Sequence, residues 1–350
     1  MAQRIKGFDG LRALAVGMVI VNHKSELGNA ISPGGYGVHL FFILSGFLII
    51  RIIHDRRLAL EAGTSNLRGE LIHFYENRLY RIWPIYYLTA AIVIGLGVIG
   101  FWPRLSATET FAILTFTTNI FQGYFWESYP VHFGPLWSVA VEEQFYLWAA
   151  PVFLLTRASS HRLICVAVIA LAIVVAALTV PLGLNVRSIY VGPLTNFGLM
   201  ALGGIAAIAM KPSARMAAWA APALILFCLS PLVAWWIGRL SLAGNLLFWA
   251  ASLLVVVTLL GIVADQSSRL TRALSLPPLE YIGRISYGLY LYHSLIVLSE
   301  WGMPPSRWTT LAEVTLSVAA AAASWRWIEQ PLLNLRDRRR SAGATRRFVS

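Results

Sequence analysis

Long apolar runs recur along the whole chain and restrict what it can fold into. Examples are the runs Leu163–Val180, Leu199–Met210 and Leu246–Val263. A helix needs about 20 mostly apolar residues to cross a bilayer, and backbone in lipid must satisfy its own hydrogen bonds. Only 13% of the residues are charged, against about 25% in soluble domains. The sequence therefore predicts an all-α, polytopic transmembrane helical bundle.

The apolar runs divide into about ten spans, with the N- and C-termini on the cytoplasmic side. The spans are expected near 7–25, 37–54, 82–101, 136–155, 162–181, 189–209, 215–237, 244–264, 284–301 and 308–329. This arrangement leaves only five of the 28 basic residues outside, as the positive-inside rule requires. The short apolar segment 108–121 is an open candidate for an eleventh span. Because an eleventh span would move the later basic loops outside, we expect an outer excursion at 102–135.

The chain is expected to form one integral-membrane domain over residues 1–335. The basic tail at 336–350 is expected to be disordered and to lie near anionic lipid headgroups. The net charge of +12 does not indicate nucleic-acid binding, because most basic residues lie in loops that are expected on one side of the membrane. Cys165 and Cys228 lie in apolar runs, which indicates core positions rather than a disulfide. No histidine and carboxylate spacing matches a metal site.

Arg12 and His23 are ionisable residues within the first apolar run. Eleven helical residues turn through about 1100°, so both side chains lie on one face, about 16 Å apart along the axis. Each residue alone has an ordinary explanation. Arg12 could be an anchor at the membrane interface, and His23 could lie at the outer interface with its ring hydrogen-bonded to a neighbouring residue. Ionisable groups inside membranes are nevertheless usually functional. The pair predicts a ligand that is anionic at its cytoplasmic end and reactive deeper in the membrane, as acyl-coenzyme A is.

Two further motifs carry ionisable residues. FYENRLYRIWPIYY places Arg78 and Arg81 on one helix face, where forked guanidinium groups suit phosphates. A stop signal with an aromatic interfacial belt would explain this stretch about as well. In LWSVAVEEQFYLW, Glu142 is expected near the depth of His23, where it could hold one imidazole nitrogen and leave the other as a base. The adjacent Glu143 points 100° away and cannot face the same cavity.

Three polar residues complete the candidates for substrate binding. His39 is expected at the outer end of the second span, near His23 in depth, although such a histidine more often caps or packs. His293 lies near mid-membrane within ISYGLYLYHSLI, a polar seam that is either structural or lines a cavity. Ser138 is a candidate for stabilising an oxyanion.

Taken together, these motifs resemble those of the integral-membrane acyltransferases of family three, which acylate extracytoplasmic glycans and some small molecules. The matching pieces are FDGLRALAVGMVIVNH, GVHLFFILSGFLI, RLYRIWP, LWSVAVEEQFYL, ISYGLYLYH and WRWIEQPL. The resemblance implies that His23 is the catalytic histidine and that Arg12, Arg78 and Arg81 serve the acyl donor. It also implies that Glu142 is the acidic residue of its motif. His39 stands where many relatives have an aspartate.

We therefore expect an O-acyltransferase of the cytoplasmic (inner) membrane. Acyl-coenzyme A, as acetyl-coenzyme A, is the expected donor substrate, with no permanently bound cofactor; the acceptor is the hydroxyl of an extracytoplasmic glycan or a related molecule. His23 is expected to act as general base oriented by Glu142, or to carry the acyl group itself. The alternative is a transporter or flippase for an anionic amphiphile with His23 as proton-coupling site. Many transporters have two related halves, and the sequence shows no such symmetry.

Overall fold

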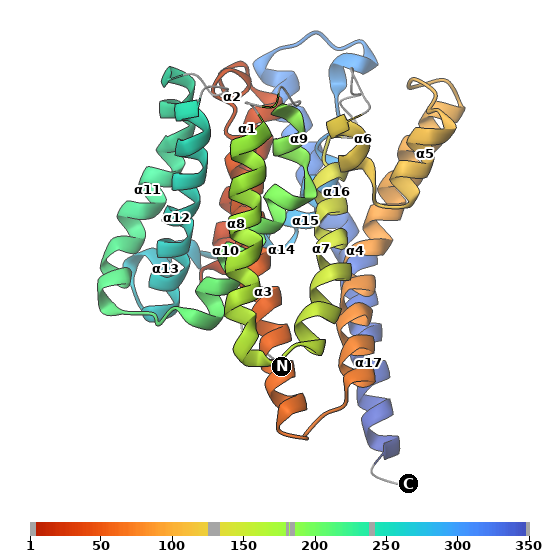
Figure 1. The fold of residues 1–350 in the computed structure, drawn as a ribbon. Helices are drawn as coiled ribbons and strands as arrows, with labels where there is room; N and C mark the ends of the chain where they lie inside the picture. Colours follow the sequence, from red (N-terminus) through yellow and green to blue (C-terminus); the bar gives the residue numbers. More distant parts are fainter. Residues whose placement is uncertain (1–4, 125–133, 180–181, 183–185, 238–241, 348–350) are drawn as a thin grey trace.

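The computed structural model describes residues 5–124, 134–179, 182, 186–237 and 242–347, and within these residues it contains helices and no strands (Figure 1). The short turns are 3-10 turns at Ala158–Ser160 and Leu298–Trp301 and a π-helical turn at Trp325–Glu329. The α-helices are α1 (Phe8–Lys24), α2 (Glu26–Ile31), α3 (Gly34–Glu61), α4 (Leu67–Val98), α5 (Ala107–Leu114), α6 (Thr118–Tyr124), α7 (Leu136–Leu155), α8 (His161–Thr179), α9 (Val186–Val191), α10 (Pro193–Ala209), α11 (Ala214–Ile237), α12 (Leu242–Ala264), α13 (Arg269–Leu274), α14 (Pro277–Arg284), α15 (Ser286–Tyr292), α16 (Arg307–Ser324) and α17 (Gln330–Arg347).

Five helical segments of the described residues are long and apolar enough to cross a membrane. They are Gly34–Glu61, Leu67–Val98, Ala158–Thr179, Ala214–Ile237 and Leu246–Ala264. The predicted all-helical membrane fold is thereby confirmed. Helices α1, α7 and α16 have 17, 20 and 18 residues, about as many as the shortest of these five segments. Each of them contains charged residues within its apolar sequence: Arg12 in α1, Glu142 and Glu143 in α7, and Glu313 in α16.

The centre of the bundle is formed by α1, α3 and α10. Helix α1 begins after Gly7, whose φ of +85° is a left-handed conformation that glycine adopts without strain. It packs against α3 and α14, whereas α10 packs against α3 and α8. Helices α11 and α12 form a pair at one side, and α4 and α17 lie at the other (Figure 1). The turn between α3 and α4 and the C-terminus lie at one end of the bundle, and α2 and α6 lie at the opposite end.

Two expected spans are interrupted in the structure. The expected span 189–209 divides at Gly192, where the backbone is extended (φ −66°, ψ 141°) and Pro193 begins α10. The expected span 284–301 is not one helix: α14 ends at Arg284, α15 ends at Tyr292, and the chain then runs irregularly to the turn at Leu298. Hydropathy does not distinguish a continuous apolar helix from a broken one, which explains both differences.

The described part of the expected outer excursion contains two short helices. Helix α5 has eight residues and α6 has seven, so α5 is about 12 Å long and too short to cross a bilayer. Segment 108–121 is therefore not a continuous membrane-crossing helix. Gln144 of α7 holds this region, since it donates to the Phe116 carbonyl at 2.7 Å and bonds the Asn119 amide at 2.8 Å. Residues 125–133 of the excursion lie outside the described residues.

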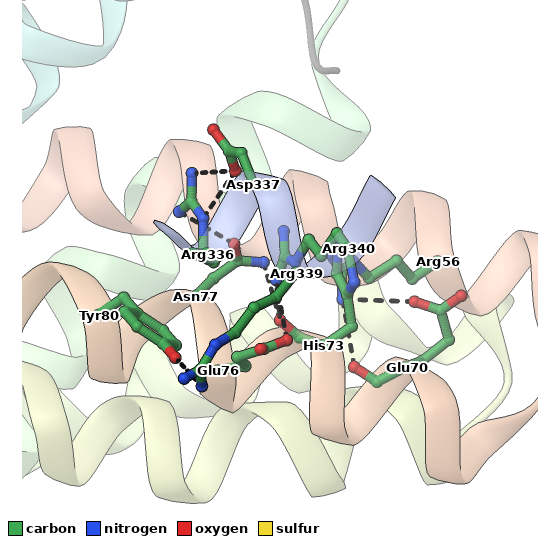
Figure 2. A network of polar contacts seen from close by, with 10 residues as sticks. All are labelled: Arg56, Glu70, His73, Glu76, Asn77, Tyr80, Arg336, Asp337, Arg339 and Arg340. Carbon is green, nitrogen blue, oxygen red and sulfur yellow. Dashed lines mark hydrogen bonds and ion pairs between the residues drawn. The ribbon is translucent and has the colours of Figure 1, made fainter. Parts of the chain in front are cut away.

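The basic tail differs from its expected form. Residues 336–347 continue α17 as a helix, so the expected boundary at 335 falls inside a helix. Arginines of α17 reach across to α4 (Figure 2): Arg336 donates to Asn77 at 3.2 Å, Arg339 to the Tyr80 hydroxyl at 2.9 Å, and Arg340 pairs with Glu76 at 3.4 Å. Contacts with α4, which a tail in isolation would lack, favour the helical form.

Candidate functional site

Three arginines from two helices line one cavity, here called the arginine cavity. Arg12 enters it from α1, and Arg78 and Arg81 enter it from α4. Glu142 and Ser138 reach it from α7, so the structure brings together five of the predicted site residues. The rest of the wall comes mainly from α3 and α15 and includes Val38, Phe41, Ser45, Tyr287 and Tyr290. Arg12 and Arg81 also line a second cavity, together with Asp9, Arg284 and Glu329.

The arginines of this cavity are only partly neutralised. Arg12 pairs with Asp9 one helical turn earlier, at 2.5 Å. The Arg78 guanidinium lies over the rings of Phe74 and Tyr146, at 6.0 and 5.6 Å from their centres, and its buried Nε has no hydrogen-bond partner. Within the described residues, neither Arg78 nor Arg81 forms an ion pair with a carboxylate. An unpartnered buried N–H is costly, and an anionic ligand would satisfy it.

The two successive glutamates of α7 face different surroundings, as their 100° separation predicts. Glu142 faces the arginine cavity and accepts hydrogen bonds from Ser45 at 2.8 Å and from the Tyr146 hydroxyl at 3.3 Å. Glu143 turns to α4, where it accepts a bond from the Trp83 indole at 3.0 Å. The prediction that Glu142 orients His23 finds no support in this geometry, because the partners of its two oxygens belong to the arginine cavity.

His23 lies instead at the other end of α1, in a larger cavity that we call the histidine cavity. This cavity has a volume of about 750 Å³ and is also lined by His39, Asn22, Arg187 and Trp137. His39 is buried against the ring of Phe248, and its Nδ1 has no partner. His23, Asn22 and Arg187 also line an adjoining cavity that contains Lys24 and Arg307. His23 itself is exposed and accessible from these spaces.

The hydrogen-bond partner of His23 is His293. The two rings approach with 3.0 Å between Nδ1 of His23 and Nε2 of His293. The other nitrogen of His293, Nδ1, lies 2.6 Å from the carbonyl oxygen of Tyr290. His293 is fully buried, although this predicted substrate-binding residue also borders the adjoining cavity that contains Lys24 and Arg307.

Tyr290 lies between the two cavities. Its side chain and that of Val38 line both of them, and its hydroxyl forms a 2.6 Å hydrogen bond with Ser138. Ser138 also donates to the Pro135 carbonyl at 3.1 Å. The partition between the arginines and His23 therefore contains the side chains of Val38 and Tyr290.

A buried ion pair braces the end of α1 next to His23. Lys24 Nζ lies 2.8 Å from the Glu313 carboxylate of α16 and donates to the Ile296 carbonyl at 2.6 Å. Glu313 also accepts a bond from the Leu298 backbone N–H at 2.6 Å. These contacts satisfy backbone groups that the irregular chain after α15 leaves without helical partners. They hold that segment, and with it His293, against α1.

We expect Glu313→Gln to lower stability by about 3–5 kcal/mol, because it leaves a buried ammonium without its counter-charge. The side chains of Lys24 and Glu313 are only 6% and 12% exposed. The matched control is Glu76→Gln, which removes the partially exposed pair with Arg340 at the α4–α17 contact (Figure 2) and should cost at most about 1 kcal/mol. Thermal unfolding in detergent compares the two. Equal losses in both variants would contradict the bracing role.

Sequence reasoning missed several residues of this site. The Lys24–Glu313 pair escaped notice because its partners are 289 positions apart, although a glutamate within the apolar run of α16 was a signal. Ser45 and Tyr146 donate hydrogen bonds to Glu142. Only Tyr146 could have been predicted from spacing, since it is four residues after Glu142 on the same helix. The pairing of His23 with His293 depends on how α15 docks, which no local pattern contains.

Comparisons with known proteins identify the family of the chain. The family model described as "Acyltransferase domain" matches residues 5–325. The chain therefore belongs to this acyltransferase family, as the resemblance predicted.

Curated relatives cover nearly the whole chain. The putative peptidoglycan O-acetyltransferase YrhL of Bacillus subtilis is 30% identical over 94% of this chain and 55% of the relative. The peptidoglycan O-acetyltransferase OatA of Listeria monocytogenes is 29% identical over 94% of this chain and 56% of its own. The O-acetyltransferase OatA of Staphylococcus aureus is 28% identical, with 94% and 57% covered. The chain thus spans just over half the length of these relatives. No solved structure matches the chain.

Proposed function

We propose that this protein is a membrane O-acetyltransferase that moves an acetyl group from coenzyme A to a hydroxyl acceptor on the opposite membrane side. The observation that carries the proposal is the pair of cavities that meet at Tyr290 and Val38. One presents three arginines, and the other presents an accessible histidine. A donor with phosphates at one end and a thioester at the other matches this order of groups.

In this proposal Arg12, Arg78 and Arg81 bind the phosphates of acetyl-coenzyme A. The unpartnered Arg78 Nε and the absence of ion pairs to Arg78 and Arg81 within the described residues support this assignment. The arginine cavity has a volume of only about 180 Å³, below the range of about 300–1,000 Å³ of small-molecule pockets. It therefore suits only part of an extended coenzyme, with phosphates at the arginines and the adjoining part of the arm. The arm passes Tyr290 and presents the thioester to His23.

His23 acts as general base in the transfer. It takes the proton of the acceptor hydroxyl while that oxygen attacks the thioester carbon. The carbon–sulfur bond then breaks, and the coenzyme A thiolate leaves and receives the proton from the imidazolium. Ester and free thiol are the products, so atoms and charge balance without a further reactant. Glu142 partly neutralises the arginine cavity and has no part in this step.

We further propose that the protein lies in the inner (cytoplasmic) membrane and crosses it ten times. Both termini are then in the cytoplasm. The positive-inside rule supports this orientation, since α17 and the α3–α4 turn with their arginines lie at the same end of the bundle (Figure 1). The arginine cavity then opens to the cytoplasm, where coenzyme A is made. His23 faces the outer side.

The acceptor in this proposal is a glycan. The relatives from Bacillus and Listeria are named as peptidoglycan O-acetyltransferases. In this chain, the histidine cavity contains aromatic rings next to polar groups: the rings of Trp137 and Tyr190 lie 4.9 Å apart, beside Asn196 and Arg187. Aromatic faces and hydrogen-bonding side chains suit a sugar, which has an apolar face and a rim of hydroxyls.

The proposal is tested by the affinity for the donor. We expect the double variant Arg78→Ala/Arg81→Ala to bind acetyl-coenzyme A about 100-fold more weakly in calorimetry, because two charge-assisted hydrogen bonds contribute about 1.5 kcal/mol each. Arg104→Ala, an exposed arginine outside these cavities, is the matched control and should bind normally.

A second ligand tests whether the weaker binding of the arginine variant is due to lost contacts with the phosphates. S-acetylpantetheine lacks the charged end of the donor, so wild type and the arginine variant should bind it equally. If the wild-type protein neither binds acetyl-coenzyme A nor releases free thiol from it with a crude glycan acceptor, the proposed donor is wrong.

A further inference from the structure

His293 lies where it can decide which nitrogen of His23 is free to react. Its Nδ1 is 2.6 Å from the Tyr290 carbonyl oxygen, which can only accept a hydrogen bond. Nδ1 of His293 therefore carries a proton. Neither ring nitrogen of His293 meets a carboxylate, since the other nitrogen contacts His23. A fully buried ring without a counter-charge is uncharged because an unpaired buried charge is costly.

A neutral imidazole has one N–H and one lone pair. With the proton of His293 on Nδ1, its Nε2 holds the lone pair and accepts a hydrogen bond. The donor is Nδ1 of His23, 3.0 Å away. The proton of His23 is thereby fixed on Nδ1, and its Nε2 is left with the lone pair.

The ring geometry agrees with this bond. The ring centres are 5.1 Å apart and the planes differ by only 17°. With 3.0 Å between the nitrogens, this is close to the largest separation that two five-membered rings allow. Both nitrogens therefore lie near the line between the ring centres, so the two rings meet edge to edge and not face to face. This approach is compatible with a hydrogen bond from Nδ1–H of His23 to the lone pair on Nε2 of His293.

We propose that His293 is a positioning residue that holds His23 in the Nδ1–H tautomer and directs its Nε2 lone pair at the substrate. This inference rests on the proposed role of His23 as base. When His23 takes the proton of the acceptor on Nε2, its Nδ1–H bond to His293 remains in place. No proton has to leave His293, and the Tyr290 carbonyl keeps the buried ring oriented throughout.

The two histidine rings differ in burial, which supports different roles for them. His23 is exposed to both outer cavities, whereas His293 is fully buried. The Lys24–Glu313 pair and its bonds to Ile296 and Leu298 fix the chain that follows His293. A buried ring held by its own backbone and by a braced segment is suited to orienting a neighbour rather than to binding a large acceptor.

The first measurement is ¹⁵N NMR of protein labelled at the histidine ring nitrogens, with the His23 signals assigned by their loss in His23→Ala. Protonated and lone-pair nitrogens have well-separated shifts. We expect His23 to be protonated at Nδ1 in the wild type and to lose this preference in His293→Leu. A wild-type His23 protonated at Nε2 would overturn the proposal. This readout does not require knowledge of the acceptor.

The second measurement is kinetic and uses two substitutions of similar size. His293→Leu removes the acceptor of the His23 bond and should lower kcat about 100-fold with little change in KM for either substrate. His293→Gln places an amide oxygen near the position of Nε2 and should restore about tenfold of that loss. A raised KM for the acceptor with an unchanged kcat would instead make His293 a binding residue and overturn the proposal.

The two hypotheses fail in different ways. If wild-type protein shows no transfer from acetyl-coenzyme A, the proposed function fails, while the NMR spectrum still decides the tautomer. If transfer occurs and depends on His23 but the NMR and the leucine variant show no coupling, the positioning role alone fails. Size-exclusion elution and thermal unfolding identify a variant that loses activity because it does not fold.

Discussion

Replacing His23 by alanine should abolish acetyl transfer while the donor still binds. We expect kcat to fall about 1,000-fold, within the range of 10² to 10⁴ for loss of a general base. The affinity for acetyl-coenzyme A should change less than threefold, because the arginines lie in a separate cavity beyond Tyr290. Free-thiol release from acetyl-coenzyme A in the presence of acceptor measures the first quantity, and calorimetry measures the second.

The matched control for His23 is His73→Ala. His73 lies on α4 and contributes its backbone carbonyl, not its ring, to the hydrogen bonds with Asn77 and Arg340. Removing its ring should leave both transfer and binding unchanged. Retention of wild-type transfer in His23→Ala would rule out His23 as the base. Equal loss of transfer in both variants would indicate damage to the fold.

Enlarging Gly46 should destabilise the bundle, and a large side chain there should prevent its assembly. A Cβ at Gly46 would lie 1.9 Å from the Met200 carbonyl oxygen of α10, and a Cβ at Gly203 would lie 1.9 Å from the Ile43 carbonyl oxygen of α3. Small residues let membrane helices approach this closely. Because both obstacles are backbone atoms, the helices themselves would have to separate. Overpacking costs about 1–3 kcal/mol where side chains can adjust, and more is expected here.

We expect Gly46→Leu to give no monodisperse folded protein in detergent and Gly46→Ala to lower Tm by several degrees. Gly95→Ala is the control, since no atom lies within 4 Å of a Cβ added there on α4. It should leave Tm unchanged or slightly raised, because alanine favours helix by about 1 kcal/mol over glycine. Folding of Gly46→Leu with a normal Tm would show that α3 and α10 are not in the contact described.

The sequence was sufficient for features that depend on local pattern. Apolar runs predicted the helices, and the 100° step between helical positions predicted that Glu142 and Glu143 diverge. The i, i+3 spacing of Arg78 and Arg81 predicted a shared face, and both line the arginine cavity. The predicted ten-span topology and the roles assigned to the site residues stay predictions.

Features that depend on packing between distant elements could not be predicted. Depth along a helix placed Glu142 near His23, but the rotation of α7 turns its carboxylate toward Ser45 and the arginines. The partner of His23 is instead His293, the residue that follows α15, 270 positions away in the sequence. The break after Tyr292, which hydropathy did not reveal, positions His293 there. Interactions with α4 likewise determine the helical form of the tail, since its composition alone favours disorder.

The partition formed by Val38 and Tyr290 has an electrical consequence for the proposed reaction. A transmembrane potential does about 2.3 kcal/mol of work per elementary charge per 100 mV. The acetyl group that passes the partition carries no charge, whereas the coenzyme phosphates remain with the arginines. The transfer step then moves no net charge through the field, and its rate should not depend on membrane voltage. The valine and tyrosine side chains line both cavities, so in this proposal the charged groups of the donor stay on one side of them and His23 on the other.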